Sequence, residues 1–246
     1  MKVLDLFSGI GGFSLGLERA GFETVAFCEI DKKAHKVLQK HWPHVPIFED
    51  VQTLTKKALD DQGIAVDVIC GGFPCQDISA AGRGAGLAGE KSGLWFEFNR
   101  LIKEIRPKYA IIENVSALRS RGLDEVLRSL AQIGYDAEWH CIPASAIGAP
   151  HRRDRIWIVA YPIGEGCQGR VSGGQDTQRE SIVGQLRCGS SVHGQSVENW
   201  WATEPKLGRV AHGIPNRVDR IKQLGNSVVP QIVEIIGRNI MKLVDT

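Results

Sequence analysis

The first 160 residues alternate between short apolar runs and amphipathic stretches, and this alternation constrains the fold more than any other feature. Lys2–Phe7 is typical of a buried strand, and a glycine turn and a helical stretch to about Ala20 follow it. Thr24–Glu29, Val66–Cys70 and Tyr109–Ile112 have the same strand character. Strands that alternate with helices in this way predict an α/β fold with a mostly parallel sheet and helices on both faces.

The last part of the chain departs from this alternation. Ala137–Ala144 and Arg155–Tyr161 are two apolar runs joined by a loop, so we expect a hairpin at one edge of the sheet. Pro162–Thr203 then contains eight Gly, five Ser and five Gln, and its apolar residues show no period, so it can bury little surface by itself. A basic segment, Lys206–Lys222, precedes a final amphipathic helix predicted over Pro230–Val244.

Composition argues against several classes of protein. The six cysteines include no CxxC pair, so neither a disulfide scaffold nor a zinc site is expected. No run of 18 apolar residues predicts a membrane span, and Met1–Gly9 has no secretory character, so we expect a cytoplasmic protein. Residues 147–246 carry 13 Lys and Arg against 9 Asp and Glu, a bias compatible both with phosphate contacts and with ordinary surface charge.

Two strand ends suggest a nucleoside ligand, because parallel sheets bind ligands at the carboxyl ends of their strands. The glycines of the first turn, within Asp5–Phe13, allow a ligand to approach the backbone. The spacing differs from the dinucleotide-binding GxGxxG pattern, because Ser14 stands at the third glycine position. Glu29, twenty residues after Gly9, is suited to accept hydrogen bonds from ribose hydroxyls. A simple tight turn and a solvated carboxylate are the alternative interpretations.

Two further strand ends carry a thiol and a carboxyl group. Cys75 follows one buried strand, and Glu113 and Asn114 end the next. Methylation at C5 of cytosine requires such a pair, because a thiolate that adds to C6 makes C5 nucleophilic while a carboxylic acid protonates or hydrogen-bonds N3. The alternatives are a structural cysteine and an Asn114 that caps the following helix.

Taken in order, these motifs resemble those of the cytosine-5 DNA methyltransferase family over nearly the whole chain outside residues 162–203. The resemblance implies a methyltransferase fold with S-adenosylmethionine (AdoMet) as cofactor. It implies that Glu29 binds the ribose, Asp50 the adenine amino group and Asn226 the amino-acid end of the cofactor. The other implied cofactor residues form the glycine turn or line the AdoMet pocket: Phe7, Gly9, Gly11, Gly12, Pro74 and Leu94.

The same resemblance assigns catalytic roles. Cys75 in GGFPCQDIS matches the nucleophile, and Glu113 in ENV matches the residue that holds the target base. In HRRDR, Arg155 matches the residue that contacts the cytosine O2, and Arg153 one that places the loop or a phosphate. His151 stands where the family has Gln, which leaves its role open.

The resemblance also implies how the chain is organised. Residues 1–161 correspond to an AdoMet-binding and catalytic domain, 162–203 to a small target-recognition insert, and 204–246 to a basic segment and a helix that packs back on the catalytic domain. Gln76–Gly93 resembles the mobile loop that closes over a base flipped out of the duplex. We expect a monomer that methylates duplex DNA without a metal, and a cognate restriction endonuclease is a further candidate partner.

Three other functions compete with DNA methylation. Transfer-RNA cytosine-5 methyltransferases share the fold and motifs, and DNA is favoured because the variable insert lies where DNA enzymes carry sequence recognition. A non-catalytic DNA-binding relative is expected to lack Cys75, Glu113 or the cofactor turn, and all three are present. A nicotinamide dehydrogenase has no use for the Cys75–Glu113 pair, and the glycine spacing is wrong for it.

We predict that Pro162–Thr203 carries sequence recognition and contributes little to stability, because eighteen of its 42 residues are Gly, Ser or Gln. Replacement of residues 164–199 by a short Gly/Ser linker should leave AdoMet binding nearly intact. Sequence-specific methylation should disappear, while salt-sensitive non-specific DNA binding remains. Calorimetry and methylation mapping measure these properties, and a shortened protein that methylates the same site with the same preference contradicts the prediction.

Overall fold

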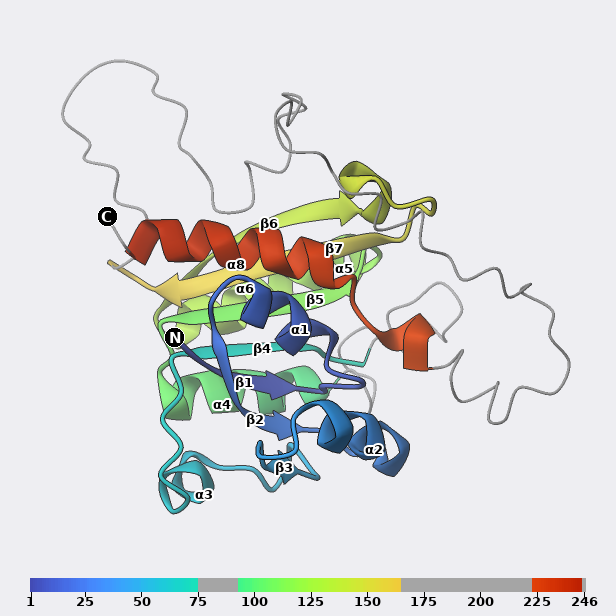
Figure 1. Cartoon of the computed structure of the whole chain (residues 1–246). Helices are drawn as coiled ribbons and strands as arrows, with labels where there is room; N and C mark the ends of the chain where they lie inside the picture. Colours follow the sequence, from blue (N-terminus) through green and yellow to red (C-terminus); the bar gives the residue numbers. More distant parts are fainter. Residues whose placement is uncertain (75–92, 165–222, 245–246) are drawn as a thin grey trace, which may run out of the picture.

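A seven-stranded sheet forms the centre of the protein in the computed structural model, which describes residues 1–74, 93–164 and 223–244 (Figure 1). Its strands lie in the order β3-β2-β1-β4-β5-β7-β6. The strands from β3 to β5 are parallel, whereas β7 is antiparallel to β5 and β6 is antiparallel to β7. The predicted α/β fold with a mostly parallel sheet is therefore confirmed.

Most of the strands lie where apolar runs predicted them. The bounds are β1 Lys2–Leu6, β2 Glu23–Cys28, β3 Ile47–Phe48, β4 Val68–Gly72, β5 Tyr109–Val115, β6 Tyr135–Pro143 and β7 Asp154–Pro162. The predicted hairpin is confirmed, since β6 and β7 pair at one edge of the sheet. β3 was not predicted, because two residues are too few to show a period.

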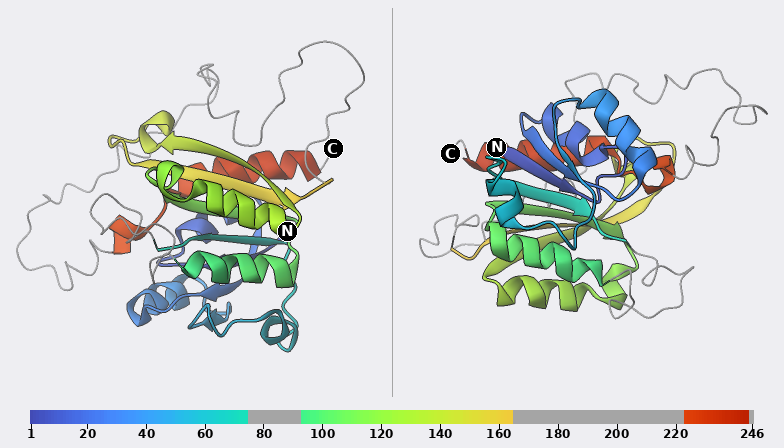
Figure 2. Two further views of the ribbon diagram at one scale, coloured as in Figure 1. Left: turned by 180° about the vertical axis from the view of Figure 1, so that it is seen from behind. Right: turned by 90° about the horizontal axis from the view of Figure 1, so that it is seen from below.

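Helices cover both faces of the sheet (Figure 2). Their bounds are α1 Gly12–Arg19, α2 Lys32–His41, α3 Lys56–Asp60, α4 Leu94–Ile105, α5 Leu118–Arg121, α6 Leu123–Gln132 and α8 Pro230–Val244, with a 3-10 helix, η2, over Ala144–Ile147. The final helix has the predicted bounds. Among the described residues, no helix combines the length and the apolar character that crossing a membrane demands.

Two hydrophobic cores follow from the alternation of side chains along the strands. Leu4 and Leu6 point to the face that α4 and α6 cover, where Trp95 and Phe98 are fully buried. Val3 points to the opposite face, which α1 and α8 cover. Because both faces of the central strands are buried, these strands are continuously apolar, and a polar residue within them calls for a specific partner.

The position of a crevice follows from the order of the strands. From β1 the chain passes through α1, on one face of the sheet, to β2, the neighbour of β1. From β4 it passes through α4, on the opposite face, to β5, the neighbour of β4 on the other side. Since β1 and β4 are neighbours, the connections diverge at their carboxyl ends (Figure 1). Doubly wound sheets bind their ligands at such a point.

The contact of α1 with α8 depends on Gly16. A Cβ atom there would lie 2.4 Å from the Pro230 carbonyl oxygen and 2.6 Å from the Val233 Cβ. We therefore expect Gly16→Ala to lower the free energy of unfolding by about 1–3 kcal/mol, although alanine is the better helix former. Chemical denaturation measures the change. Leu15→Ala, at a position 38% exposed on the same helix, is the control and should cost less.

Candidate active site

A cavity of about 380 Å³ lies at the carboxyl ends of β1, β2, β4 and β5, a volume typical of small-molecule sites. Many of the predicted site residues line it: Phe7, Gly9, Gly12, Glu29, Pro74, Glu113, Arg153, Arg155 and Asn226. Gly11, Asp50 and Leu94 are not among its lining residues. Cys75, directly after Pro74, lies outside the described residues.

A buried carboxyl group holds the glycine turn in place. Asp5, fully buried in β1, accepts hydrogen bonds from the Ser14 hydroxyl at 2.7 Å and the Ser14 N–H at 3.3 Å. Burial raises the pKa of the Asp5 carboxyl from 3.8 to about 7. The turn itself has a left-handed backbone at Phe7 and Gly9, with φ of 53° at both. Asp5 was not predicted as a site residue, although a charged residue within an apolar strand indicates a specific partner.

Glu29 joins the glycine turn to the start of α2. Its Oε2 accepts a hydrogen bond from the Gly9 N–H at 2.7 Å, and its Oε1 accepts one from the Asp31 N–H at 2.8 Å. A carboxylate offers about four acceptor positions, so Glu29 retains the capacity to accept from two ribose hydroxyls. The His35 ring donates through Nε2 to the Glu29 carbonyl oxygen and so fixes the backbone from the next helix.

The segment with Asn226 also lines the cavity. The Arg153 guanidinium donates through Nη2 to the carbonyl oxygens of Gly225 at 2.9 Å and Ser227 at 2.6 Å, on either side of Asn226. Arg153 has a φ of 35°, a strained conformation for a non-glycine residue. Gly12 allows the close approach, because a Cβ there would lie 2.5 Å from the Ser227 Oγ. Arg153 thus connects two motifs that are far apart in the sequence.

Glu113 is a buried acid paired with Arg155. The Arg155 Nε donates to the Glu113 Oε1 at 2.9 Å. Gly72, opposite Glu113 on β4, leaves room for the carboxyl group, since a Cβ there would lie 2.8 Å from Oε2. Burial raises the pKa of Glu113 from 4.5 to about 7, while the positive charges of Arg155 and Arg153 partly offset this effect. Near neutral pH this carboxyl group can therefore exist in both the protonated and the ionised form.

Asn114 does not cap a helix, so that interpretation is wrong. Its Nδ2 donates to the Phe73 carbonyl oxygen at 3.0 Å, and its Oδ1 accepts from the Val115 N–H at 2.8 Å. The next helix, α5, has Ala117 at its N-cap position instead. Asn114 therefore ties the end of β5 to the backbone two residues before Cys75. No local sequence pattern indicates this bond, because it spans 41 residues.

Three predicted site residues do not line the cavity: Gly11, Asp50 and Leu94. Gly11 packs under the ring of Trp42, which a Cβ would approach to 2.5 Å. Asp50 is the second residue after β3, and its Oδ1 accepts from the Gln52 N–H at 2.9 Å. Leu94 begins α4. Within the described ranges, no group of three or more His, Cys, Asp or Glu side chains is arranged to hold a metal ion.

The family model that matches this chain is that of the C-5 cytosine-specific DNA methylases, over residues 1–182. The chain is 36% identical over 168 residues to the Type II methyltransferase M2.BsuMI of Bacillus subtilis, and 39% identical over 164 residues to M.Eco47II of Escherichia coli. These alignments cover 65% and 64% of this chain but only 42% and 39% of the two relatives. This chain thus aligns with about two fifths of the length of each relative.

A solved structure gives the same picture of the fold. The chain matches a DNMT2 variant of Spodoptera frugiperda with a TM-score of 0.55 and 20% sequence identity. The match covers 73% of this chain and 53% of that one. At this identity the likeness concerns the fold alone.

The pKa of Glu113 predicts a pH dependence of stability. A folded-state pKa above the unfolded one means that the folded protein binds the proton more tightly, so this group's contribution to stability is lost as pH rises from about 4.5 to about 7. We expect denaturant unfolding of Glu113→Gln to lack this loss, which amounts to about 1–3 kcal/mol. Asp5 contributes equally to both proteins and cancels in the difference. If the difference in the free energy of unfolding between the two proteins changes by no more than about a few tenths of a kcal/mol between pH 4 and pH 8, the raised pKa of Glu113 is refuted.

Proposed function

Because the chain belongs to the C-5 cytosine-specific DNA methylase family, we propose that it transfers a methyl group from AdoMet to C5 of a cytosine in duplex DNA. The observation that carries the proposal is the buried Glu113–Arg155 pair beside the strand that leads to Cys75. A carboxyl group with a pKa of about 7 is matched to proton transfer at neutral pH. Such a group is what C5 methylation needs at N3 of the base.

In the proposed reaction, the Cys75 thiolate adds to C6 of a cytosine flipped out of the duplex, and the electron pair of the C5–C6 bond becomes available at C5. Glu113 donates its proton, or a hydrogen bond, to N3 as negative charge develops there, and Arg155 orients the carboxyl group and contacts O2. Bound AdoMet would supply the electrophilic methyl group for C5 and would be released as the thioether S-adenosylhomocysteine. A base then removes the C5 proton, the Cys75 thiolate leaves C6, the C5–C6 double bond returns, and any proton held at N3 goes back to Glu113.

The described residues fit AdoMet as the cofactor. A Cβ at Gly9 would meet no atom within 4 Å, so the space above this turn is open to a ligand. Glu29 lies at the same turn with acceptor capacity for a ribose, and Asn226 lines the same cavity. We infer that Glu29 and Asn226 bind opposite ends of the cofactor, with Phe7 and Pro74 at the wall between them.

Duplex DNA is the proposed substrate, and transfer RNA is the competing one. The relatives named above are Type II methyltransferases, and this favours DNA modification and a cognate restriction endonuclease as a partner. The proposed recognition insert, residues 162–203, falls almost entirely outside the described residues, as does the basic segment Lys206–Lys222. Methyl transfer from labelled AdoMet to duplex DNA and to transfer RNA, compared side by side, distinguishes the two substrates.

The nucleophile is tested by trapping its adduct. DNA that contains 5-fluorocytosine has no C5 proton to lose, so the protein should remain covalently bound to it in the presence of AdoMet. We expect Cys75→Ala to form no such complex and to lose methyl transfer, while it still binds AdoMet in calorimetry. Cys141→Ala, at an exposed cysteine of β6, is the matched control and should behave as the wild type does.

Two outcomes count against the proposal. Turnover of Cys75→Ala within about tenfold of the wild type excludes Cys75 as the nucleophile, because loss of the covalent nucleophile should lower the rate by far more. Transfer to RNA without transfer to DNA replaces the proposed substrate with the competing one.

A further inference from the structure

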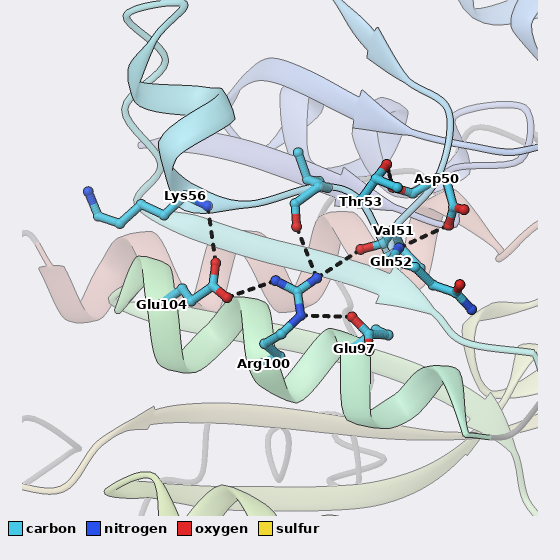
Figure 3. Close-up of polar contacts among 9 residues, drawn as sticks. Asp50, Val51, Gln52, Thr53, Lys56, Glu97, Arg100 and Glu104 are labelled. Atoms are coloured by element: carbon cyan, nitrogen blue, oxygen red, sulfur yellow. Dashed lines mark hydrogen bonds and ion pairs between the residues drawn. The ribbon is translucent and has the colours of Figure 1, made fainter.

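Arg100 connects α4 to the chain segment that follows β3 (Figure 3). It lies in the middle of α4, and its side chain is 29% exposed. Its Nε donates to Glu97 at 2.7 Å and its Nη1 to Glu104 at 2.8 Å, both on its own helix. Its Nη2 donates to the carbonyl oxygens of Val51 at 3.0 Å and Leu54 at 2.9 Å. Four hydrogen bonds thus extend from one guanidinium group.

The two carbonyl groups belong to a segment that lies outside the helices and strands of the described residues. Residues 49–55 connect β3 to α3, and Val51 and Leu54 are buried in spite of this irregular backbone. Glu104 adds a third attachment, because its Oε2 accepts from the Lys56 N–H at 3.1 Å. Buried backbone groups that lack such partners cost free energy, so α4 supplies the segment with the partners that it cannot supply itself.

Asp50 stands at the start of the attached segment. Its carbonyl oxygen accepts from the N–H groups of Thr53 at 3.2 Å and Leu54 at 3.1 Å, while its carboxylate accepts from the Gln52 N–H. These bonds form a closed turn, in which the direction of the Asp50 side chain depends on the backbone from residue 50 to residue 54. Arg100 holds that backbone at Val51, directly after Asp50, and at Leu54, where the turn closes.

We propose that Arg100 is a positioning residue for the adenine end of the cofactor. It acts through Asp50, because it holds the turn that carries this carboxylate, for which the family resemblance implies a contact with the adenine amino group. The inference rests on the proposed function, because it needs AdoMet as the ligand. It also gives α4 a second task beside the contact expected of Leu94, so that one helix serves two parts of the cofactor pocket.

The geometry of the guanidinium group explains why arginine occupies this position. Two carbonyl oxygens and two carboxylates lie around it, and a planar fork reaches all four, whereas a lysine ammonium group has three donors and no fork. Arg128 on α6 offers a comparison within the same chain. It pairs with Glu125 at 3.3 Å and Asp124 at 3.9 Å, and both of these residues lie on its own helix.

The experiment measures the dissociation constants of two compounds for the whole chain. One is S-adenosylhomocysteine, and the other is its analogue with hydrogen in place of the adenine 6-amino group. The wild type should prefer the first by about tenfold, because one hydrogen bond to a carboxylate is lost with the second. Arg100→Lys should weaken S-adenosylhomocysteine about tenfold and leave the analogue almost unchanged, so the preference disappears. Asp50→Ala should do the same, and the double variant should lose nothing further.

Controls separate positioning from general loosening. Arg128→Lys should bind both compounds as the wild type does. If Arg100→Lys does not fold, Glu104→Gln is used instead, since it weakens one attachment and keeps the guanidinium group; a loss of about two- to threefold for S-adenosylhomocysteine alone is then expected. The ratio of the two dissociation constants does not depend on the folded fraction of a preparation.

Each remaining outcome is decisive. Equal weakening of both compounds in Arg100→Lys, or no weakening of either, overturns the positioning role while the proposed function stands. A wild type that binds neither compound overturns the proposed function, and this inference with it.

Discussion

The divergence of the chain at the carboxyl ends of β1 and β4 determines where everything else in the protein can lie. Two neighbouring parallel strands continue to opposite faces of the sheet, so no connection covers the space between their ends. The glycine turn follows β1 there, and the residues that lead to Cys75 follow β4 there. Glu29 from β2 and Glu113 from β5 come from the two flanking strands, and the cavity between them is the result.

Buried carboxyl groups then give this crevice its chemistry. Asp5 and Glu113 are both removed from water, and burial raises the pKa of each to about 7. Their partners differ: Asp5 is held by the hydroxyl and N–H of Ser14, whereas Glu113 faces the charge of Arg155. The first arrangement fixes a turn, and the second keeps an acid available beside the position proposed for the base. Similar burial therefore supports two different tasks, and the partner decides which.

The sequence predicted the parts that depend on local pattern. Apolar runs located the strands, and the period of residues 230–244 located α8. The motif around Glu29 likewise led to a residue that lines the cavity. Contacts between distant residues escaped prediction: Asn114 was interpreted as a cap because the next helix is near in sequence, yet its partner is Phe73. The bonds from Arg100 span 46 and 49 residues, and only the packing of α4 on the sheet brings their ends together.

The packing of α8 against α1 has a consequence for the order of events during synthesis. Val3, Phe13 and Leu17 emerge from the ribosome first, but the apolar surface that covers them belongs to Ile232, Val233 and Ile236. Until those residues are made, one face of β1 and the outer side of the glycine turn remain exposed to water. Until α8 has been made, the nascent chain thus exposes an apolar surface of the kind that chaperones bind.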